Sequence, residues 1–204
     1  MDSVDLWKIE HACYEDGFAC ICGVDEAGRG PLAGPVCAAA VILPADLELP
    51  GLNDSKKLTD KKRRELYDLI TEQAVAYAIA LVDEKTVDEI NILQATFLAV
   101  QRAVSDLRTT PDIVLIDGNR APELSVPTKT IVKGDSLSAS IAAASILAKV
   151  TRDRLMEELD EQYPEYGFAV HKGYGTKRHY EALRINGPSP IHRMSFLKKF
   201  YGEA

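Results

Sequence analysis

An α/β fold, built on a mixed β-sheet flanked by helices, is the fold class that this sequence predicts. Three apolar segments precede the main helical patterns, and two shorter ones alternate with helices later in the chain. Such an order of elements indicates a sheet whose later strands are interleaved with helices. The length of 204 residues suits one domain. We therefore expect residues 1–204 to form a single domain, with a C-terminal loop and helical extension from about residue 163.

The first four elements are expected to be strand, strand, helix and strand. Apolar side chains, many of them Val and Ile, predict strands over residues 19–24, 36–43 and 75–82. The intervening helix should begin near Thr59, because Leu66, Leu69 and Ile70 recur at helical spacing after the polar residues 53–55.

The later elements alternate. Apolar residues at intervals of three and four predict a helix over residues 93–107, and short strands are expected over 113–116 and 130–132. A long helix should cover residues 137–159, with a charged, solvated second half. Residues 138–146, in its first half, are unusually small, which would let the helix lie close against the sheet. A loop from Tyr163 then leads to a helix over 177–185 and a basic tail.

Composition argues against membrane insertion and secretion. The longest charge-free apolar stretch, residues 31–45, contains three prolines and is shorter than the about 20 residues that span a bilayer. Acidic side chains near the N-terminus are unlike a secretory signal, so a cytoplasmic location is expected. The four cysteines lack paired C-x-x-C spacing, and buried reduced thiols are favoured over a zinc site of His11, Cys13, Cys20 and Cys22.

The charge distribution is uneven. A net charge of −7 argues against a wholly basic surface that coats nucleic acid. Residues 171–204 nevertheless hold seven basic and two acidic side chains, and a second basic run covers residues 56–64. Alone, the second run is typical of a solvated helix face.

Acidic residues occur where apolar strands end or turns begin. Asp25 and Glu26 follow the first strand, Asp117 follows the strand over 113–116, and Asp135 follows residues 130–132. Taken singly, Asp117 fits a turn before glycine, and Asp135 fits a helix N-cap. Taken together, the four acids are expected to converge in one site, because functional groups of α/β sheets collect at the carboxyl ends of strands. Four clustered carboxylates are hard ligands suited to Mg²⁺ or Mn²⁺, and two such ions support phosphodiester hydrolysis.

Gly28, Gly30 and Ala33 also satisfy G-x-G-x-x-A, the dinucleotide-binding pattern. That pattern requires a helix after the glycines, whereas Pro35 and the β-like residues 36–43 follow here. In a dinucleotide site, the negative carboxylates of Asp25 and Glu26 would also face the negative pyrophosphate. The glycines are better explained by close approach of backbone amides to a different ligand. The phosphate-binding G-x-x-x-x-G-K-[ST] motif is absent from the sequence.

Several co-linear motifs resemble those of the bacterial type 2 ribonucleases H, the ribonuclease HII family. They are Asp25-Glu26-Ala27-Gly28-Arg29-Gly30, Asn53-Asp54-Ser55-Lys56-Lys57-Leu58, Asp117-Gly118-Asn119, Lys133-Gly134-Asp135-Ser136, residues 142–153 and His171-Lys172-Gly173-Tyr174-Gly175-Thr176. The resemblance extends over about residues 20–193. No clamp-binding segment is recognisable at the C-terminus.

The resemblance implies an RNase H-like fold and endonucleolytic cleavage of RNA in RNA/DNA hybrids, including a single ribonucleotide embedded in duplex DNA. Cleavage on the 5′ side of the ribonucleotide would leave 3′-hydroxyl and 5′-phosphate ends. A monomer is expected.

The resemblance also implies roles for named residues. Asp25, Glu26, Asp117 and Asp135 would be the catalytic, metal-binding carboxylates, holding two Mg²⁺ or Mn²⁺ ions. The substrate contacts would be Gly28, Arg29 and Gly30 at the ribose 2′-hydroxyl, Tyr174 at the neighbouring sugar, and Lys56 and Lys57 at phosphates.

Two other classes of protein are weighed against this hypothesis. A Holliday-junction resolvase or other DNA nuclease would also use clustered carboxylates but has no reason to read a 2′-hydroxyl. A non-catalytic hybrid-binding module would not need four acids. His171 and His192 are expected to be structural, Asp153 a surface or ion-pair residue, and the two basic runs the surfaces that hold the duplex.

Overall fold

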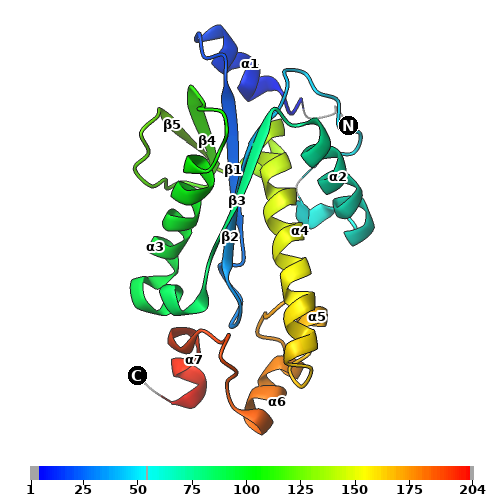
Figure 1. The fold of residues 1–204 in the computed structure, drawn as a ribbon, viewed down its shortest axis with the longest axis vertical. Helices are drawn as coiled ribbons and strands as arrows, with labels where there is room; N and C mark the ends of the chain where they lie inside the picture. The colour runs from blue at the N-terminus through cyan, green and yellow to red at the C-terminus, as the bar shows by residue number, and fades with distance from the viewer. Residues whose placement is uncertain (1–4, 54, 203–204) are drawn as a thin grey trace.

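A five-stranded mixed sheet forms the centre of the molecule in the computed structural model, which describes residues 5–53 and 55–202 (Figure 1). The strand order is β3-β2-β1-β4-β5. Strands β1, β2 and β3 pair antiparallel, whereas β4 pairs parallel with both β1 and β5. The strands are β1 Ile21–Ala27, β2 Val36–Ile42, β3 Ala76–Val82, β4 Ile113–Asp117 and β5 Thr128–Ile131.

Helices cover both faces of this sheet. Helix α3 packs on one face, and α4 with α2 packs on the other (Figure 1). The helices are α1 Lys8–Glu15, α2 Asp60–Gln73, α3 Glu84–Ser105, α4 Ala139–Gln162, α5 Phe168–His171, α6 Lys177–Asn186 and α7 Met194–Tyr201, with 3₁₀ turns η1 Ser55–Lys57 and η2 Gly134–Ser136. The predicted fold class, a mixed sheet flanked by helices with a helical C-terminal part, is confirmed.

Helix α4 lies close against β1, as its small side chains predicted. A Cβ atom placed on Gly23 would come within 2.1 Å of the carbonyl carbon of Ser140. Two sets of hydrogen bonds fix the start of α4. The Ser138 hydroxyl accepts the N–H of Ile141, and the buried Glu10 carboxylate accepts from the hydroxyls of Ser138 and Ser140. Helix α1, which the sequence analysis did not predict, thereby anchors the long helix.

The predicted end of the first strand and the predicted start of the helix over 93–107 were wrong. Strand β1 runs on to Ala27, because Asp25 and Glu26 continue the antiparallel pairing with β2. Helix α3 begins at Glu84, where Asp83 caps it, and not at residue 93. Asn91, with φ 67° and ψ 163°, interrupts the helix, and its side-chain oxygen accepts the N–H groups of two following residues. The predicted helix is therefore the second half of a longer one.

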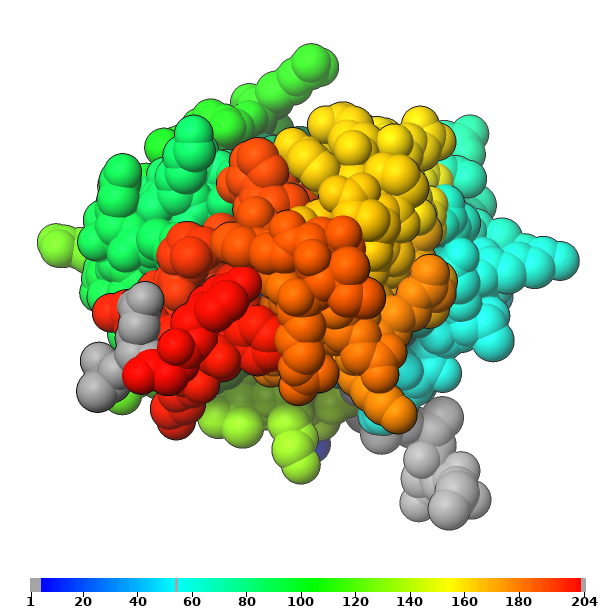
Figure 2. All heavy atoms as spheres, turned by 90° about the horizontal axis from the view of Figure 1, so that it is seen from below, coloured from blue at the N-terminus to red at the C-terminus, as the bar shows by residue number. Residues whose placement is uncertain are grey.

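The predicted basic tail contains helix α7, which was not predicted from the sequence. Leu197 of α7 is fully buried in an apolar cluster with residues such as Leu32, Met156 and Phe168. The C-terminal segment, orange to red, covers the middle of one end of the molecule between α3 and α4 (Figure 2). None of the helices in the described ranges combines the length and the apolar character that crossing a bilayer requires.

Candidate active site

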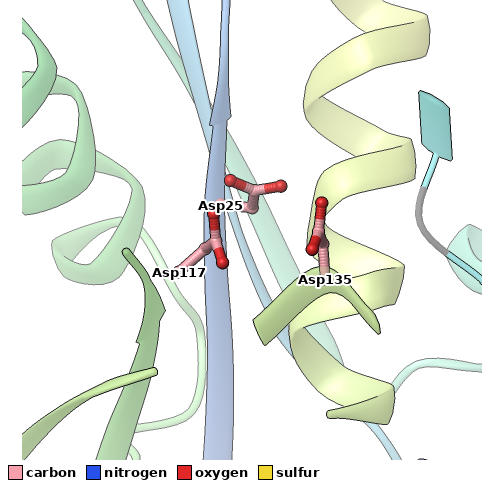
Figure 3. A group of neighbouring side chains, drawn as sticks. All are labelled: Asp25, Asp117 and Asp135. Carbon is pink, nitrogen blue, oxygen red and sulfur yellow. The ribbon is translucent and has the colours of Figure 1, made fainter. Parts of the chain in front are cut away.

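Three aspartates from different elements meet beside the sheet. One carboxylate oxygen from each of Asp25, Asp117 and Asp135 lies within 4.8 Å of the others (Figure 3). Asp25 belongs to β1, Asp117 is the last residue of β4, and Asp135 belongs to η2. Asp25 and Asp135 are buried, and Asp117 is half-buried. The three predicted carboxylates at strand ends and turns therefore converge.

Strand register explains why Asp25 and Asp117 meet. In the parallel β1–β4 pair, Val24 lies opposite Ile116, so each aspartate is the next residue along its strand. Side chains alternate between the faces of a sheet, and both aspartates fall on the face that α4 covers. Asp25 pairs with Ala39 of β2, which packs in the α4 layer.

Asp117 also positions the turn that holds Asp135. Its Oδ1 accepts the backbone N–H of Gly134 at 2.6 Å. Gly134 has no room for a side chain, because a Cβ there would come within 2.6 Å of Ile141 Cδ1. The end of β4 and the η2 turn are thus held together through one of the site's own carboxylates.

Glu26, the fourth predicted ligand, lies on the opposite face of β1. It pairs with Ala38, which packs in the α3 layer, as the alternation of side chains along a strand requires. Its Oε1 accepts from Arg29 Nη1 at 3.2 Å. Glu26 is not among the residues that group within 4.8 Å, although it borders a pocket on the Asp117 side and another on the Asp25 side. The structure brings three of the four predicted carboxylates together and places the fourth beside them.

Asp25 and Glu26 are desolvated and lie close to other negative charges. Burial, followed by the charges of Glu26 and Asp117, raises the pKa of Asp25 well above its usual range. Burial also raises the pKa of Glu26, which the charge of Arg29 opposes. Lys56 Nζ lies 3.4 Å from Asp135 Oδ2, but the lysine side chain is 76% exposed. A crowded, desolvated set of oxygen donors is the environment that a hard divalent cation stabilises, so the three aspartates could hold a metal ion.

The glycine-flanked loop lies in the same hollow. The pocket that contains Asp25 is also lined by Gly28, Gly30, Lys56 and Tyr174. Gly28 has φ +94°, and a Cβ there would come within 2.1 Å of Arg152 Nε. A Cβ on Gly30 would instead make an ordinary 3.6 Å contact with the Tyr174 ring. Gly28 is therefore required by the fold, whereas the space beside Gly30 is left open by the protein.

Three buried histidines hold the segment that carries Tyr174. His192 Nδ1 accepts the N–H of Ser189, so the proton of this ring is on Nε2, which donates to His179 Nε2 at 2.9 Å. His179 Nδ1 in turn donates to the carbonyl oxygen of Tyr174 at 2.9 Å. His171 likewise accepts the Gly173 N–H through Nδ1. Each ring is neutral in this network, and the expectation that His171 and His192 have structural roles agrees with these contacts.

Acidification should therefore destabilise the protein. Burial, followed by the charge of His179, lowers the pKa of His192 from 6.5 to about 4. Because the folded-state pKa is depressed, the stabilisation is complete above the unfolded value of about 6.5 and is lost as pH falls toward 4. We expect the free energy of unfolding to fall by roughly 3 kcal/mol at most over this window.

Urea unfolding at pH 7 and pH 5 measures this dependence. His192→Asn is the control, because its side-chain oxygen can still accept the Ser189 N–H but does not titrate. If the two proteins lose the same stability between the two pH values, His192 is not a source of the acid sensitivity.

The basic runs are only partly surface charge. Lys56 and Lys57 are exposed on η1, and Lys56 lies beside the aspartates, whereas Asp54 of the same motif is outside the described residues. Arg63, however, donates to the carbonyls of Ser55 and Leu58. Arg63 thus serves the fold, and the role of the two basic runs in holding the duplex stays a prediction.

Two buried arginines were not predicted from the sequence. Arg152 and Arg193 are 1% and 0% exposed, and their guanidinium groups donate to backbone carbonyls. Asp153 is buried as well and pairs with Lys149 at 2.8 Å, so the second half of α4 is not uniformly solvated. Their burial could not be predicted from neighbouring residues, because a backbone carbonyl partner can come from any residue type.

Two alternatives from the sequence analysis do not fit the structure. Gly28 and Gly30 lead into strand β2 and not into a helix, so the dinucleotide-binding arrangement is absent from these described residues. The four cysteines are free, and within the described ranges His11, Cys13, Cys20 and Cys22 do not group as metal ligands. Burial raises the pKa of Cys22 and Cys37 to about 12, so both remain thiols.

Comparison with known proteins gives a consistent result. The family model described as "Ribonuclease HII" matches residues 22–199. A ribonuclease HII of Acetivibrio thermocellus is 56% identical over 197 residues, which cover 97% of this chain and 77% of that protein. One from Desulfitobacterium hafniense is 59% identical over 191 residues, covering 94% and 74% respectively. The crystal structure of the ribonuclease H2 from Pyrococcus horikoshii OT3 superposes with a TM-score of 0.76 at 28% identity, covering 90% of this chain and 98% of that one.

Proposed function

Because the chain belongs to the ribonuclease HII family and cleaves the RNA of RNA/DNA hybrids, we propose that it also incises duplex DNA on the 5′ side of a single embedded ribonucleotide. The proposed products carry 3′-hydroxyl and 5′-phosphate ends. The observation that supports this proposal is the hollow in which Asp25 lies beside the Gly28–Gly30 loop and Tyr174. A backbone phosphate at the aspartates would place the adjoining sugar near that loop.

The proposed metal ligands are Asp25, Glu26, Asp117 and Asp135; the three aspartates are grouped within 4.8 Å, and Glu26 lies beside them. Two Mg²⁺ or Mn²⁺ ions are proposed, and when bound such ions supply an activated water and stabilise the leaving oxygen. The contribution of the chain is to hold the carboxylates before the ion arrives. Asp117 does this through its bond to the Gly134 N–H, and Asp25 through the Glu26 N–H at 2.7 Å.

The proposed substrate contacts divide into those that read the sugar and those that hold the phosphates. Backbone groups of Gly28, Arg29 and Gly30 would approach the 2′-hydroxyl, the only group that separates RNA from DNA at one position. The exposed Tyr174 ring, adjacent to Gly30, would pack on the neighbouring sugar. Lys56 and Lys57 would contact phosphates, which position a duplex without reading its sugars.

The test is a strand-cleavage assay on a duplex with one ribonucleotide, compared with the same duplex made only of DNA. With Mg²⁺ or Mn²⁺, we expect one nick 5′ of the ribonucleotide, and we expect a chelator to abolish it. Equal cleavage of the all-DNA duplex would instead favour a DNA nuclease with shared metal chemistry. Binding of the ribonucleotide-containing duplex without cleavage would favour a non-catalytic module.

Other parts of the hypothesis remain predictions. A single domain is supported by the C-terminal segment, whose Arg193 and Ile191 bond to residues of the loop between β1 and β2. The monomeric state and the cytoplasmic location rest on the sequence analysis.

A further inference from the structure

Arg193, just before helix α7, is bonded to the loop between β1 and β2. Nη2 donates to the carbonyl of Gly28 at 2.7 Å, and Nη1 donates to those of Arg29 and Pro31 at 3.1 and 3.0 Å. Nε and Nη2 both donate to the carbonyl of Gly34, at 2.9 and 2.7 Å. One fully buried guanidinium thus gathers four carbonyls of the loop that contains Gly28 and Gly30.

The charge of Arg193 makes this arrangement unusual. Within the described residues, every hydrogen bond of its guanidinium is to a backbone carbonyl. Burial lowers the pKa of Arg193 to about 10, with Arg152 adding to the effect and the charges of Asp88 and Glu84 opposing it, so the group stays charged at neutral pH. Because a buried cation needs its hydrogen-bond partners, the carbonyls of the loop and the side chain constrain each other.

Peptide geometry connects these bonds to the substrate side of the loop. In a trans peptide the C=O and the N–H of the next residue point in opposite directions. The described peptide bonds are all trans. Since the carbonyls of Gly28 and Arg29 point at the guanidinium, the N–H groups of Arg29 and Gly30 point away from it. Both residues are exposed and line the hollow that contains Asp25, and within the described residues neither N–H has an acceptor.

Arg193 is itself held in place from α3. The Asp88 carboxylate accepts the N–H groups of Met194 and Ser195 at 2.7 and 3.0 Å. The Arg193 N–H donates to the Leu32 carbonyl at 2.8 Å. The start of α7 is therefore fixed to both α3 and the loop.

We propose that Arg193 is a positioning residue for ribonucleotide recognition, which aims the N–H groups of Arg29 and Gly30 at the 2′-hydroxyl. The proposal rests on the function proposed above. Arg193 is buried and does not touch the substrate, so its effect passes through the loop. Asp88 acts one step further away, through the first turn of α7.

The test compares Arg193→Lys and Arg193→Ala with the wild-type chain. Lysine keeps the positive charge, but its single ammonium group lacks the planar guanidinium that reaches four carbonyls at once. We expect kcat/KM on a single embedded ribonucleotide to fall about 100-fold, as small misplacements of binding groups do. Affinity for an all-DNA duplex should stay within about 2-fold, because phosphate contacts are unchanged. Added guanidinium ion should restore part of the activity of Arg193→Ala, and methylammonium should not.

Leu197→Ala is the control for stability, because it empties a buried position in α7 without removing a bond to the loop. It should lower Tm but keep kcat/KM within about 3-fold. If the Arg193 variants do not fold, Asp88→Ala supplies the test, with a smaller fall in kcat/KM expected. The proposal is overturned if Arg193→Lys, or Asp88→Ala where it is needed, loses no more activity than Leu197→Ala. Failure of the proposed function is distinct, since the wild-type chain would then not select the ribonucleotide.

Discussion

Asp117→Asn should reduce the rate of cleavage by on the order of 10³-fold or more at saturating Mg²⁺. The substitution preserves shape, and the new side-chain oxygen can still accept the Gly134 N–H that Asp117 accepts at 2.6 Å. It removes one negative charge from three carboxylates whose oxygens lie within 4.8 Å of one another. The expected loss therefore reflects metal binding and not the fold, and it is measured as single-turnover rate against Mg²⁺ concentration.

Asp112→Asn is a matched control at the other end of β4. Its Oδ2 accepts the N–H groups of Ala19 and Cys20 at 2.9 and 2.8 Å, bonds that an amide oxygen can keep. Near-wild-type turnover is expected for this variant. Should Asp117→Asn behave like Asp112→Asn, Asp117 is a turn residue and the aspartate metal site is wrong.

Gly30→Val should lower kcat/KM on a single embedded ribonucleotide by about 100-fold while the protein remains folded. A Cβ at position 30 makes only a 3.6 Å contact with Tyr174, and Gly30 is not among the glycines with positive φ. The added branches would occupy the open space that the backbone needs for close approach to the ribose. Cleavage kinetics together with thermal unfolding separate the two effects.

Gly28→Ala gives the opposite pattern and serves as the comparison. At φ +94°, with Arg152 Nε 2.1 Å from the new Cβ, the variant should lose about 2 kcal/mol or more of unfolding free energy. Gly30→Val should lose activity without a comparable loss of stability. If Gly30→Val instead unfolds as readily as Gly28→Ala, the role of Gly30 is structural.

Much of the fold and the position of three carboxylates could be predicted from local pattern. Apolar strands ending near Asp25 and Asp117, and a turn at Asp135, are features of neighbouring residues, and the parallel β1–β4 pairing then brings the first two together. The long helix α4 was predicted from the same kind of signal, because small side chains permit the close contact with Gly23.

The position of Glu26 required the structure. The strand predicted over residues 19–24 ends before both acids, which left Asp25 and Glu26 free to point the same way. In the structure β1 continues to Ala27, so alternation sends Asp25 toward α4 and Glu26 toward α3. The boundary was hidden because two acidic residues are poor indicators of a strand, and only pairing with β2 keeps them in one.

The chemistry of the candidate site is visible in the sequence as carboxylates near strand ends beside a glycine-flanked loop. How that loop is held depends on tertiary contacts. Arg193 and Gly34 are 159 residues apart along the chain, and their bond joins a guanidinium to a backbone carbonyl. Because every residue has a backbone carbonyl, the partner of this arginine cannot be identified from residue type. Arginine is mostly exposed in proteins, so its burial could be recognised only in the folded chain.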